Sequence, residues 1–184
     1  LDDIRAMLAT CPPRTFCGDR NRAIILCLLD SGLRASEFLA LNIADVDLAT
    51  GTVVVRAGNA KGRKARVVFV GAKARRALTL YLRHRPEATP ADPLWVTETG
   101  TRLRYAGLDS LIERRAMAAR IDCPGLHAFR RSFAIHAHRA GADILQLQRL
   151  MGHSDLTVLR RYLRFDEDDL RRAHDQSGPV DHLL

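Results

Sequence analysis

The sequence has 184 residues, 47% of them hydrophobic, and a formal net charge of +8 at pH 7. This length is enough to bury a core within one domain, so the fold needs neither disulfides nor a structural metal. The positive charge indicates a polyanionic partner. The four cysteines lack metal-site spacing, and the sequence shows no signal peptide and no apolar run of membrane-spanning length. We therefore expect a cytoplasmic protein with reduced thiols that binds no membrane.

The first third of the chain begins with patterns typical of helices. Residues 2–9 predict a short helix, and residues 19–30 are mostly apolar and predict a buried one. Gly32 is well placed to end the buried helix, because glycine tolerates the left-handed C-terminal position. A further short helix is expected over about residues 35–41.

Runs of β-branched residues then predict a small antiparallel sheet. Its strands are expected at about 46–48, 53–56 and 65–70, joined by a Thr-Gly turn and by a lysine-containing turn. Glycines punctuate the rest of the chain, whose patterns are helical. Those helices are expected over about residues 72–85, 105–119, 127–140, 143–151, 155–163 and 166–174. The fold class predicted is mostly α with one three-stranded antiparallel sheet (α+β).

Two arginines stand in short helical motifs. Arg34 lies in SGLRASE between two expected helices, and Arg130 lies in HAFR. A guanidinium group can donate two hydrogen bonds to a phosphate, and His127 would share a helical face with Arg130. An ordinary ion pair between Arg34 and Glu37, and a capping role for His127, explain the same spacings. In the functional interpretation the arginines bind phosphate and Glu37 orients neighbouring cationic groups.

The turn KGRKAR at residues 61–66 holds two of the three lysines in a chain with 26 arginines. An ammonium group can be tuned to lose its proton, whereas a guanidinium group in practice cannot. A general acid that protonates a leaving oxygen must be able to lose a proton, so a lysine suits that role. The residues alone do not decide which lysine would act, and a solvated hairpin turn fits the segment equally well. Lys64 and Arg66 could instead contact backbone phosphates.

Tyr162 lies nine residues after His153, and Arg160, Arg161 and Arg164 surround it. Most tyrosines are packing residues with one polar end. A tyrosine among arginines is a poor core residue, however, and a reasonable nucleophile at a phosphate. His153 either ends a helix or donates a hydrogen bond to a phosphate oxygen.

The order of these motifs resembles the catalytic domain of the tyrosine recombinases, also called the phage integrase family. Its first box is similar to GLRASE and its lysine turn to KGRK, in which the first lysine, Lys61, corresponds to the catalytic one. Its second box, HxLRHSFA, is similar to residues 127–134. Its third box, LGH with a tyrosine nine residues after the histidine, is similar to residues 151–153 and Tyr162. Departures fall between the reactive positions, at Phe129, Arg131, Met151, Val158 and Leu159.

The resemblance implies cleavage and rejoining of double-stranded DNA through a 3′-phosphotyrosyl intermediate. Because that link retains the bond energy, neither a metal, nor another cofactor, nor ATP is required. The implied catalytic set is Tyr162 as nucleophile, Arg34 and Arg130 as phosphate clamps, Lys61 as general acid, and His127 and His153 as hydrogen-bonding or acid–base groups, with Glu37 in support. Further DNA contacts would come from Lys64, Arg66, Arg131, Arg160 and Arg161.

The resemblance also implies a domain organisation and an assembly. Residues 1–184 would be a C-terminal catalytic domain with a tail over about 166–184, and the family's N-terminal DNA-clamping domain has no counterpart in this sequence. The opening at Leu1, without a methionine, is typical of a fragment. Family members act as homotetramers on DNA, to which the tail would contribute by docking on a neighbour. A tail that packs within its own chain is the alternative.

Two other functions remain compatible with the motifs. A type IB topoisomerase uses nearly the same residues to relax supercoiled DNA without producing recombinants. A catalytically silent DNA-binding regulator would share the basic charge, although every reactive residue type is present here.

Overall fold

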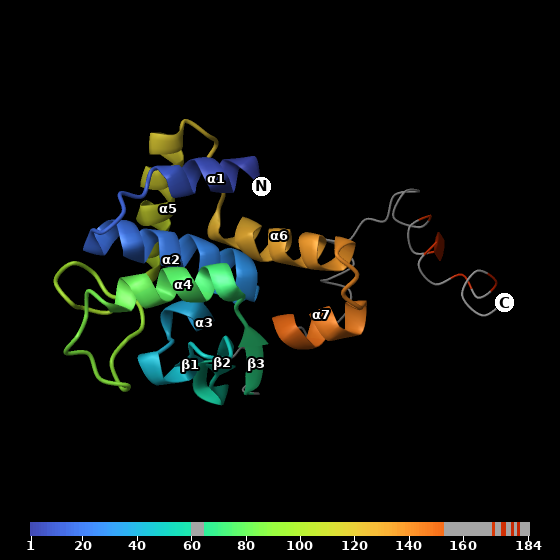
Figure 1. The fold of residues 1–184 in the computed structure, drawn as a ribbon, viewed down its shortest axis with the longest axis horizontal. Coiled ribbons are helices and arrows are strands. Elements are labelled where there is room, and N and C mark those ends of the chain that lie inside the picture. The colour runs from blue at the N-terminus through green and yellow to red at the C-terminus, as the bar shows by residue number, and fades with distance from the viewer. Residues whose placement is uncertain (60–64, 153–170, 172–173, 176–177, 179, 181–184) are drawn as a thin grey trace.

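The computed structural model describes residues 1–59 and 65–152, together with residues 171, 174–175, 178 and 180. Its elements are α1 (Asp2–Ala9), α2 (Phe16–Ser31), α3 (Ala35–Leu39), η1 (Ile43–Asp45), β1 (Val46–Asp47), β2 (Thr52–Val55), η2 (Ala57–Asn59), β3 (Arg66–Phe69), α4 (Ala72–Leu82), α5 (Tyr105–Ala119), α6 (Leu126–Arg139) and α7 (Ile144–Met151) (Figure 1). The predicted class, mostly α with one small antiparallel sheet, is confirmed. The helix predicted over 155–163, and nearly all of the one over 166–174, lie outside the described residues. No helix in the described part is long and apolar enough to cross a bilayer.

The helix α2 runs through the middle of the domain beside α4 (Figure 1). It begins at the Thr15 cap, whose hydroxyl accepts a hydrogen bond from the Gly18 N–H at 3.0 Å. It ends at Gly32, whose φ of 61° is left-handed, as predicted. A Cβ at Gly32 would lie 2.4 Å from the Phe133 ring of α6. The turn into Arg34 therefore needs glycine both for its conformation and for its packing.

The strands pair antiparallel in the order β1-β2-β3. Val53 pairs with Val68, and both side chains are buried on the face that covers α2. Because side chains alternate along a strand, Arg66 shares the inward face with Val68, whereas Val67 points outward and is exposed. The sheet thus directs one arginine towards the interior.

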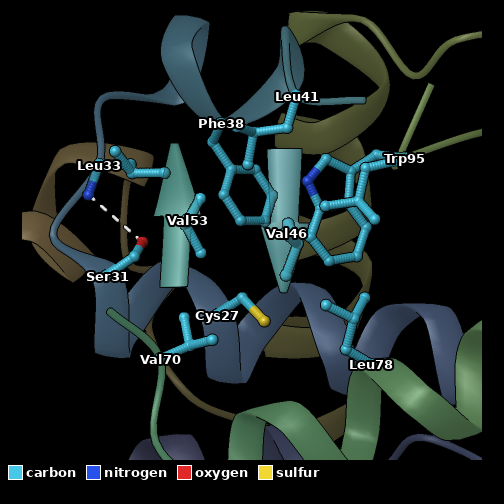
Figure 2. A pocket seen from close by; sticks show the side chains of 11 residues that line it. Cys27, Ser31, Leu33, Phe38, Leu41, Val46, Val53, Val70, Leu78 and Trp95 are labelled. Carbon is cyan, nitrogen blue, oxygen red and sulfur yellow. Dashed lines mark hydrogen bonds between the residues drawn. The ribbon is translucent and has the colours of Figure 1, made fainter. Parts of the chain in front are cut away.

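The core is centred on Trp95, which stacks between Phe38 and Tyr81 at ring-centroid distances of 4.7 and 5.8 Å. A small cavity lies beside it (Figure 2), lined by Cys27, Ser31, Leu33, Phe38, Leu41, Val46, Val53, Val70, Leu78, Leu94 and Trp95. Burial, followed by the charge of Asp30, raises the pKa of the Cys27 thiol to about 12. This thiol stays protonated at neutral pH, so the cavity is a packing feature without an activated nucleophile.

A second apolar cluster of Ala134, Leu147 and Met151 holds α7 against α6. The helix α7 begins at Asp143, whose carboxylate accepts hydrogen bonds from two backbone N–H groups of the first turn. Contacts with β3 fix its other end. The C-terminal end of α7 therefore lies where α3, α6 and the sheet meet.

Candidate functional site

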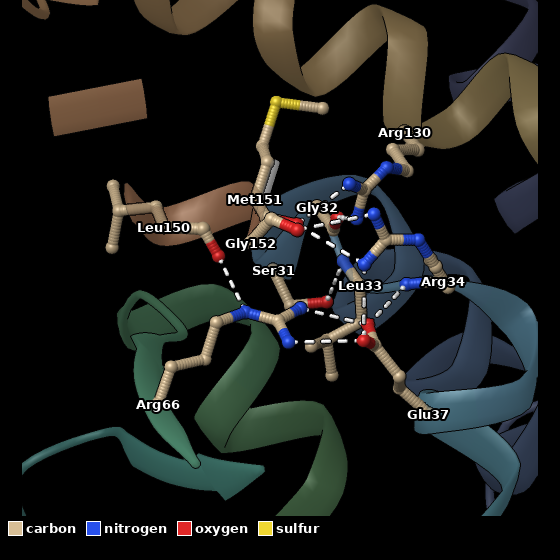
Figure 3. A network of polar contacts seen from close by, with 10 residues as sticks. All are labelled: Ser31, Gly32, Leu33, Arg34, Glu37, Arg66, Arg130, Leu150, Met151 and Gly152. Atoms are coloured by element: carbon tan, nitrogen blue, oxygen red, sulfur yellow. Dashed lines mark hydrogen bonds and ion pairs between the residues drawn. The ribbon is translucent and has the colours of Figure 1, made fainter. Parts of the chain in front are cut away.

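A buried carboxylate, that of Glu37, joins two of the arginines at this meeting point (Figure 3). Its Oε1 accepts a hydrogen bond from Arg34 Nη1 at 3.1 Å, and its Oε2 accepts one from the Arg34 backbone N–H at 3.0 Å. Arg66 donates to both oxygens, from Nη1 at 2.9 Å and from Nη2 at 2.7 Å. The expected pairing of Glu37 with neighbouring cations is thus present, and one of those cations comes from β3.

Three consecutive carbonyl oxygens at the end of α7 each accept a hydrogen bond from a different arginine. Leu150 accepts from Arg66 Nε at 2.9 Å, Met151 from Arg130 Nη2 at 2.6 Å, and Gly152 from Arg34 Nη2 at 3.1 Å. The last carbonyls of a helix have no partner within the helix, and cations are favoured at that negative end. The three guanidinium groups therefore cap α7, and α7 in turn fixes their positions.

Arg130 is more deeply buried than its predicted role suggested. Its side chain is 2% exposed and also donates to the Gly32 carbonyl oxygen at 2.5 Å. His127, one turn earlier on α6, is exposed. The two side chains therefore differ in accessibility, because the ends of α2 and α7 cover Arg130 but not His127.

Arg66 also lies differently from the expected DNA contact. Its side chain is only 12% exposed and points to Glu37 and Leu150. The alternation of β3 could have indicated this, because Arg66 is two residues before the buried Val68. Arg131 is exposed on α6, as a DNA contact would require. The other predicted site residues lie outside the described part of the chain: Lys61, Lys64, His153, Arg160, Arg161 and Tyr162.

Glu37 is shared by two guanidinium groups in the described part of the chain. Its carboxylate pairs with both Arg34 and Arg66, so one negative charge faces two positive ones. Burial by itself would raise the pKa of Glu37, but hydrogen bonds from Arg66 and from the Arg34 backbone, with the charges of both guanidinium groups, hold it below its usual value. Glu37 is therefore ionised at neutral pH, and Arg34 and Arg66 continue to share its single negative charge.

Arg34 is the most accessible of the three arginines, with 24% of its side chain exposed. Its Nη1 donates to Glu37 and, at 3.5 Å, to the Met151 oxygen, and its Nη2 donates to Gly152. A guanidinium group has five N–H donors. The Nε–H of Arg34 and one of its Nη2–H groups therefore have no acceptor among the described residues. This geometry suits an anion that approaches from solvent and accepts two hydrogen bonds.

The chain belongs to the phage integrase family, which matches residues 1–168. The resemblance of the motifs is thereby confirmed. The helical fold with its small sheet is shared with solved tyrosine recombinases, in agreement with the family.

Among curated relatives, tyrosine recombinase XerC of Pelobacter propionicus is 32% identical over 180 residues, which are 97% of this chain and 59% of that protein. Among solved structures, the XerA recombinase superposes with a TM-score of 0.79 at 26% identity, covering 95% of this chain and 61% of that one. The XerH site-specific recombinase, in its post-cleavage complex with palindromic difH substrate, gives a TM-score of 0.75 at 27% identity. The match covers 94% of this chain and 49% of that one. The chain thus spans about half to three fifths of the length of these relatives.

Proposed function

We propose that this chain is the catalytic domain of a site-specific DNA recombinase. The observation that carries the proposal is the meeting of Arg34, Arg66 and Arg130 at the end of α7, just before His153, where Arg34 and Arg66 share one carboxylate. Arg34 shares its carboxylate with Arg66, is partly exposed and keeps donors that have no acceptor among the described residues, so it is suited to receive an anion. A phosphodiester at Arg34 would accept hydrogen bonds from those donors.

In the proposed reaction Tyr162 attacks the scissile phosphate. A bond forms between its oxygen and phosphorus while the bond from phosphorus to the 5′ oxygen breaks, and Lys61 gives that oxygen a proton. One of the two histidines, His127 or His153, takes the phenolic proton. Arg34 and Arg130 stabilise the charge on the non-bridging oxygens as it develops. Attack by the 5′ hydroxyl of a partner strand reverses the step and completes strand exchange.

Double-stranded DNA is the partner that this chemistry requires, and the net charge of +8 favours it. The solved XerH site-specific recombinase is bound to palindromic difH substrate. We further propose that the active species is a homotetramer on DNA, with residues 170–184 docking on a neighbour. Tetramers that still form, and still exchange strands, after deletion of residues 170–184 would contradict the role of the tail.

Covalent trapping tests the chemistry directly. The protein is mixed with fragmented genomic DNA of its source organism and denatured, and the DNA that remains attached is sequenced. We expect an adduct on the 3′ phosphate of the cut strand that is lost in Tyr162→Phe. Tyr105→Phe is the matched control, because Tyr105 is exposed at the start of α5 and should be dispensable.

Other outcomes separate the competing functions. An adduct that persists in Tyr162→Phe would remove the assigned nucleophile. Tight, salt-sensitive binding without any adduct would indicate a silent DNA-binding module. Relaxed circles without recombinant products would indicate a topoisomerase.

The proposed chemistry uses guanidinium and ammonium groups to balance the phosphate charge. We therefore expect the yield of adduct to be unchanged in excess chelator. A strict dependence on Mg²⁺, restored by adding the ion back, would contradict the assignment of Arg34, Arg130 and Lys61.

A further inference from the structure

Arg66 takes part in no step of the proposed reaction, yet each of its three nitrogens donates to a protein acceptor. Both Nη atoms donate to Glu37, at 2.9 and 2.7 Å, and Nε donates to the Leu150 carbonyl oxygen at 2.9 Å. A two-pronged guanidinium–carboxylate pair has a narrow range of geometries. The side chain is therefore held in one position and turned away from solvent.

Glu37 is the link between Arg66 and Arg34. Its Oε1 accepts from both guanidinium groups, at 2.9 Å from Arg66 and at 3.1 Å from Arg34. With Arg66 present, the carboxylate has a full counter-charge of its own. Without Arg66, Glu37 would have Arg34 as its only guanidinium partner among the described residues, and the positive potential of Arg34 towards an anion would fall.

Arg66 also joins three segments that carry predicted reactive groups. It lies on β3, five residues after Lys61, it holds the carboxylate that caps the turn of Arg34, and it binds the end of α7 before His153. Its guanidinium packs against Gly152, where a Cβ would lie 2.9 Å from Arg66 Cζ. Gly152, with a φ of 64°, thus provides both the turn that ends α7 and room for this group.

We propose that Arg66 is a positioning residue, which neutralises Glu37 and fixes the end of α7 so that the charge and orientation of Arg34 serve the phosphate. This inference rests on the proposed recombinase function. It replaces the DNA-backbone contact expected from the sequence with an indirect role. The two roles differ measurably, because a phosphate contact contributes to the salt dependence of binding and a positioning contact does not.

The test compares Arg66→Gln with Arg115→Gln. Arg115 is a matched control, because it is a partly buried arginine that donates to a backbone carbonyl, that of Thr10 at 2.7 Å, and its loss changes the net charge equally. With activity normalised to the folded fraction, we expect Arg66→Gln to slow adduct formation on the order of 10²-fold, a typical cost of misplacing a catalytic group. Arg115→Gln should keep the parent rate. Parent-like cleavage by Arg66→Gln would overturn the proposal.

Salt dependence distinguishes positioning from contact. Log Kd for DNA should vary with log salt at the same slope in the two variants. A slope lower by about one in Arg66→Gln alone would show a direct phosphate contact and overturn the proposal. Arg66→Lys, which keeps the charge but not the two-pronged geometry, should fall between the parent and Arg66→Gln in cleavage rate.

A double variant tests whether Arg66 acts through Arg34. In an Arg34→Gln background, Arg66→Gln should slow adduct formation by less than about threefold, because residues that act as a unit are non-additive. A further slowing as large as in the parent background would show that Arg66 acts independently of Arg34 and would overturn the proposed link between them. A parent that forms no adduct would instead refute the proposed function. In that case the NMR signals of the Arg34 guanidinium group decide, since they should shift in Arg66→Gln but not in Arg115→Gln, and unchanged signals would overturn the inference.

Discussion

The two ends of α2 each carry a buried polar cluster, and the two clusters differ in accessibility and in how the carboxylate is shared. At the N-terminal end Asp19 and Arg20 are 7% and 6% exposed. Arg20 donates to the Val96 carbonyl oxygen at 3.0 Å, and Asp19 pairs with His84 Nε2 at 2.8 Å. At the C-terminal end Arg34 and Arg66 share the carboxylate of Glu37. Arg34 is 24% exposed, so this second cluster, unlike the first, presents a guanidinium group to a ligand.

This difference distinguishes a polar cluster that stabilises the fold from one that can bind a ligand. Buried polar groups are tolerated when they are hydrogen-bonded, and Asp19 and Arg20 both find partners within their cluster. In the Glu37 cluster Arg34 is partly exposed and has donors without an acceptor among the described residues. We infer that the first cluster serves the fold, and that the second keeps Arg34 available for the phosphate.

The largest expected effect is on the rate of DNA cleavage, which should respond to the Glu37 cluster and not to the Asp19 cluster. Arg34→Gln should slow adduct formation by about 10²–10³-fold, the usual cost of one donor to developing charge. Arg20→Gln, measured at a temperature where circular dichroism shows a folded protein, should retain the parent rate. Equal losses in both variants would mean that the accessibility of Arg34 does not identify the site.

Removing the carboxylate of each cluster tests the same comparison through the free energy of unfolding. Glu37→Gln should lower the free energy of unfolding by about 3 kcal/mol, because it leaves buried guanidinium groups without their counter-charge. Asp19→Asn should cost about 1 kcal/mol, since its partner His84 is partly exposed and the pair is weaker. Urea denaturation followed by circular dichroism measures both. A larger loss for Asp19→Asn would reverse the ranking of the clusters.

The pH dependence of stability sharpens the role of Glu37. Its pKa is lower in the folded protein than the ordinary 4.5, so its contribution is fully present well above that pH. As the pH falls below about 4.5 the unfolded chain takes up the proton first, and the contribution is lost on approaching the lower folded pKa. The stability gap between the parent and Glu37→Gln should therefore narrow in acid. A stability difference that widens in acid would contradict the conclusion that Glu37 is ionised in the folded protein.

The smallest effect is anion binding without DNA. Sulfate at about ten times its Kd should raise the stability of the parent by about 1.4 kcal/mol, seen as a higher melting temperature than in chloride of equal ionic strength. Arg34→Gln should show only the general effect of sulfate on protein surfaces, whereas Arg20→Gln should behave like the parent. An equal sulfate effect in all three proteins would mean that Arg34 does not bind the anion.

Local features were predictable because they depend on neighbouring residues. The left-handed end of α2 at Gly32 and the three strands follow from short patterns, and both are confirmed. The Arg34–Glu37 pair follows from their i, i+3 spacing, although Arg34 is the N-cap of α3 rather than a helical residue. The partners of Arg66 and Arg34 at the end of α7 were not predictable, because they lie 84 and 118 residues away in the sequence. They are also backbone carbonyls, which every residue possesses, so no side-chain pattern marks them.

The sequence by itself determined the family, the fold class and the order of the reactive residue types, since these are written in local spacing and hydrophobic pattern. Only the tertiary structure decided which arginines face solvent and which are buried. It turned Arg66 inward by the alternation of β3, covered Arg130 with the ends of two helices, and left Arg34 partly exposed. The physical reason is that burial and charge balance depend on all groups that meet at a point in space. Here those groups come from four separate segments of the chain.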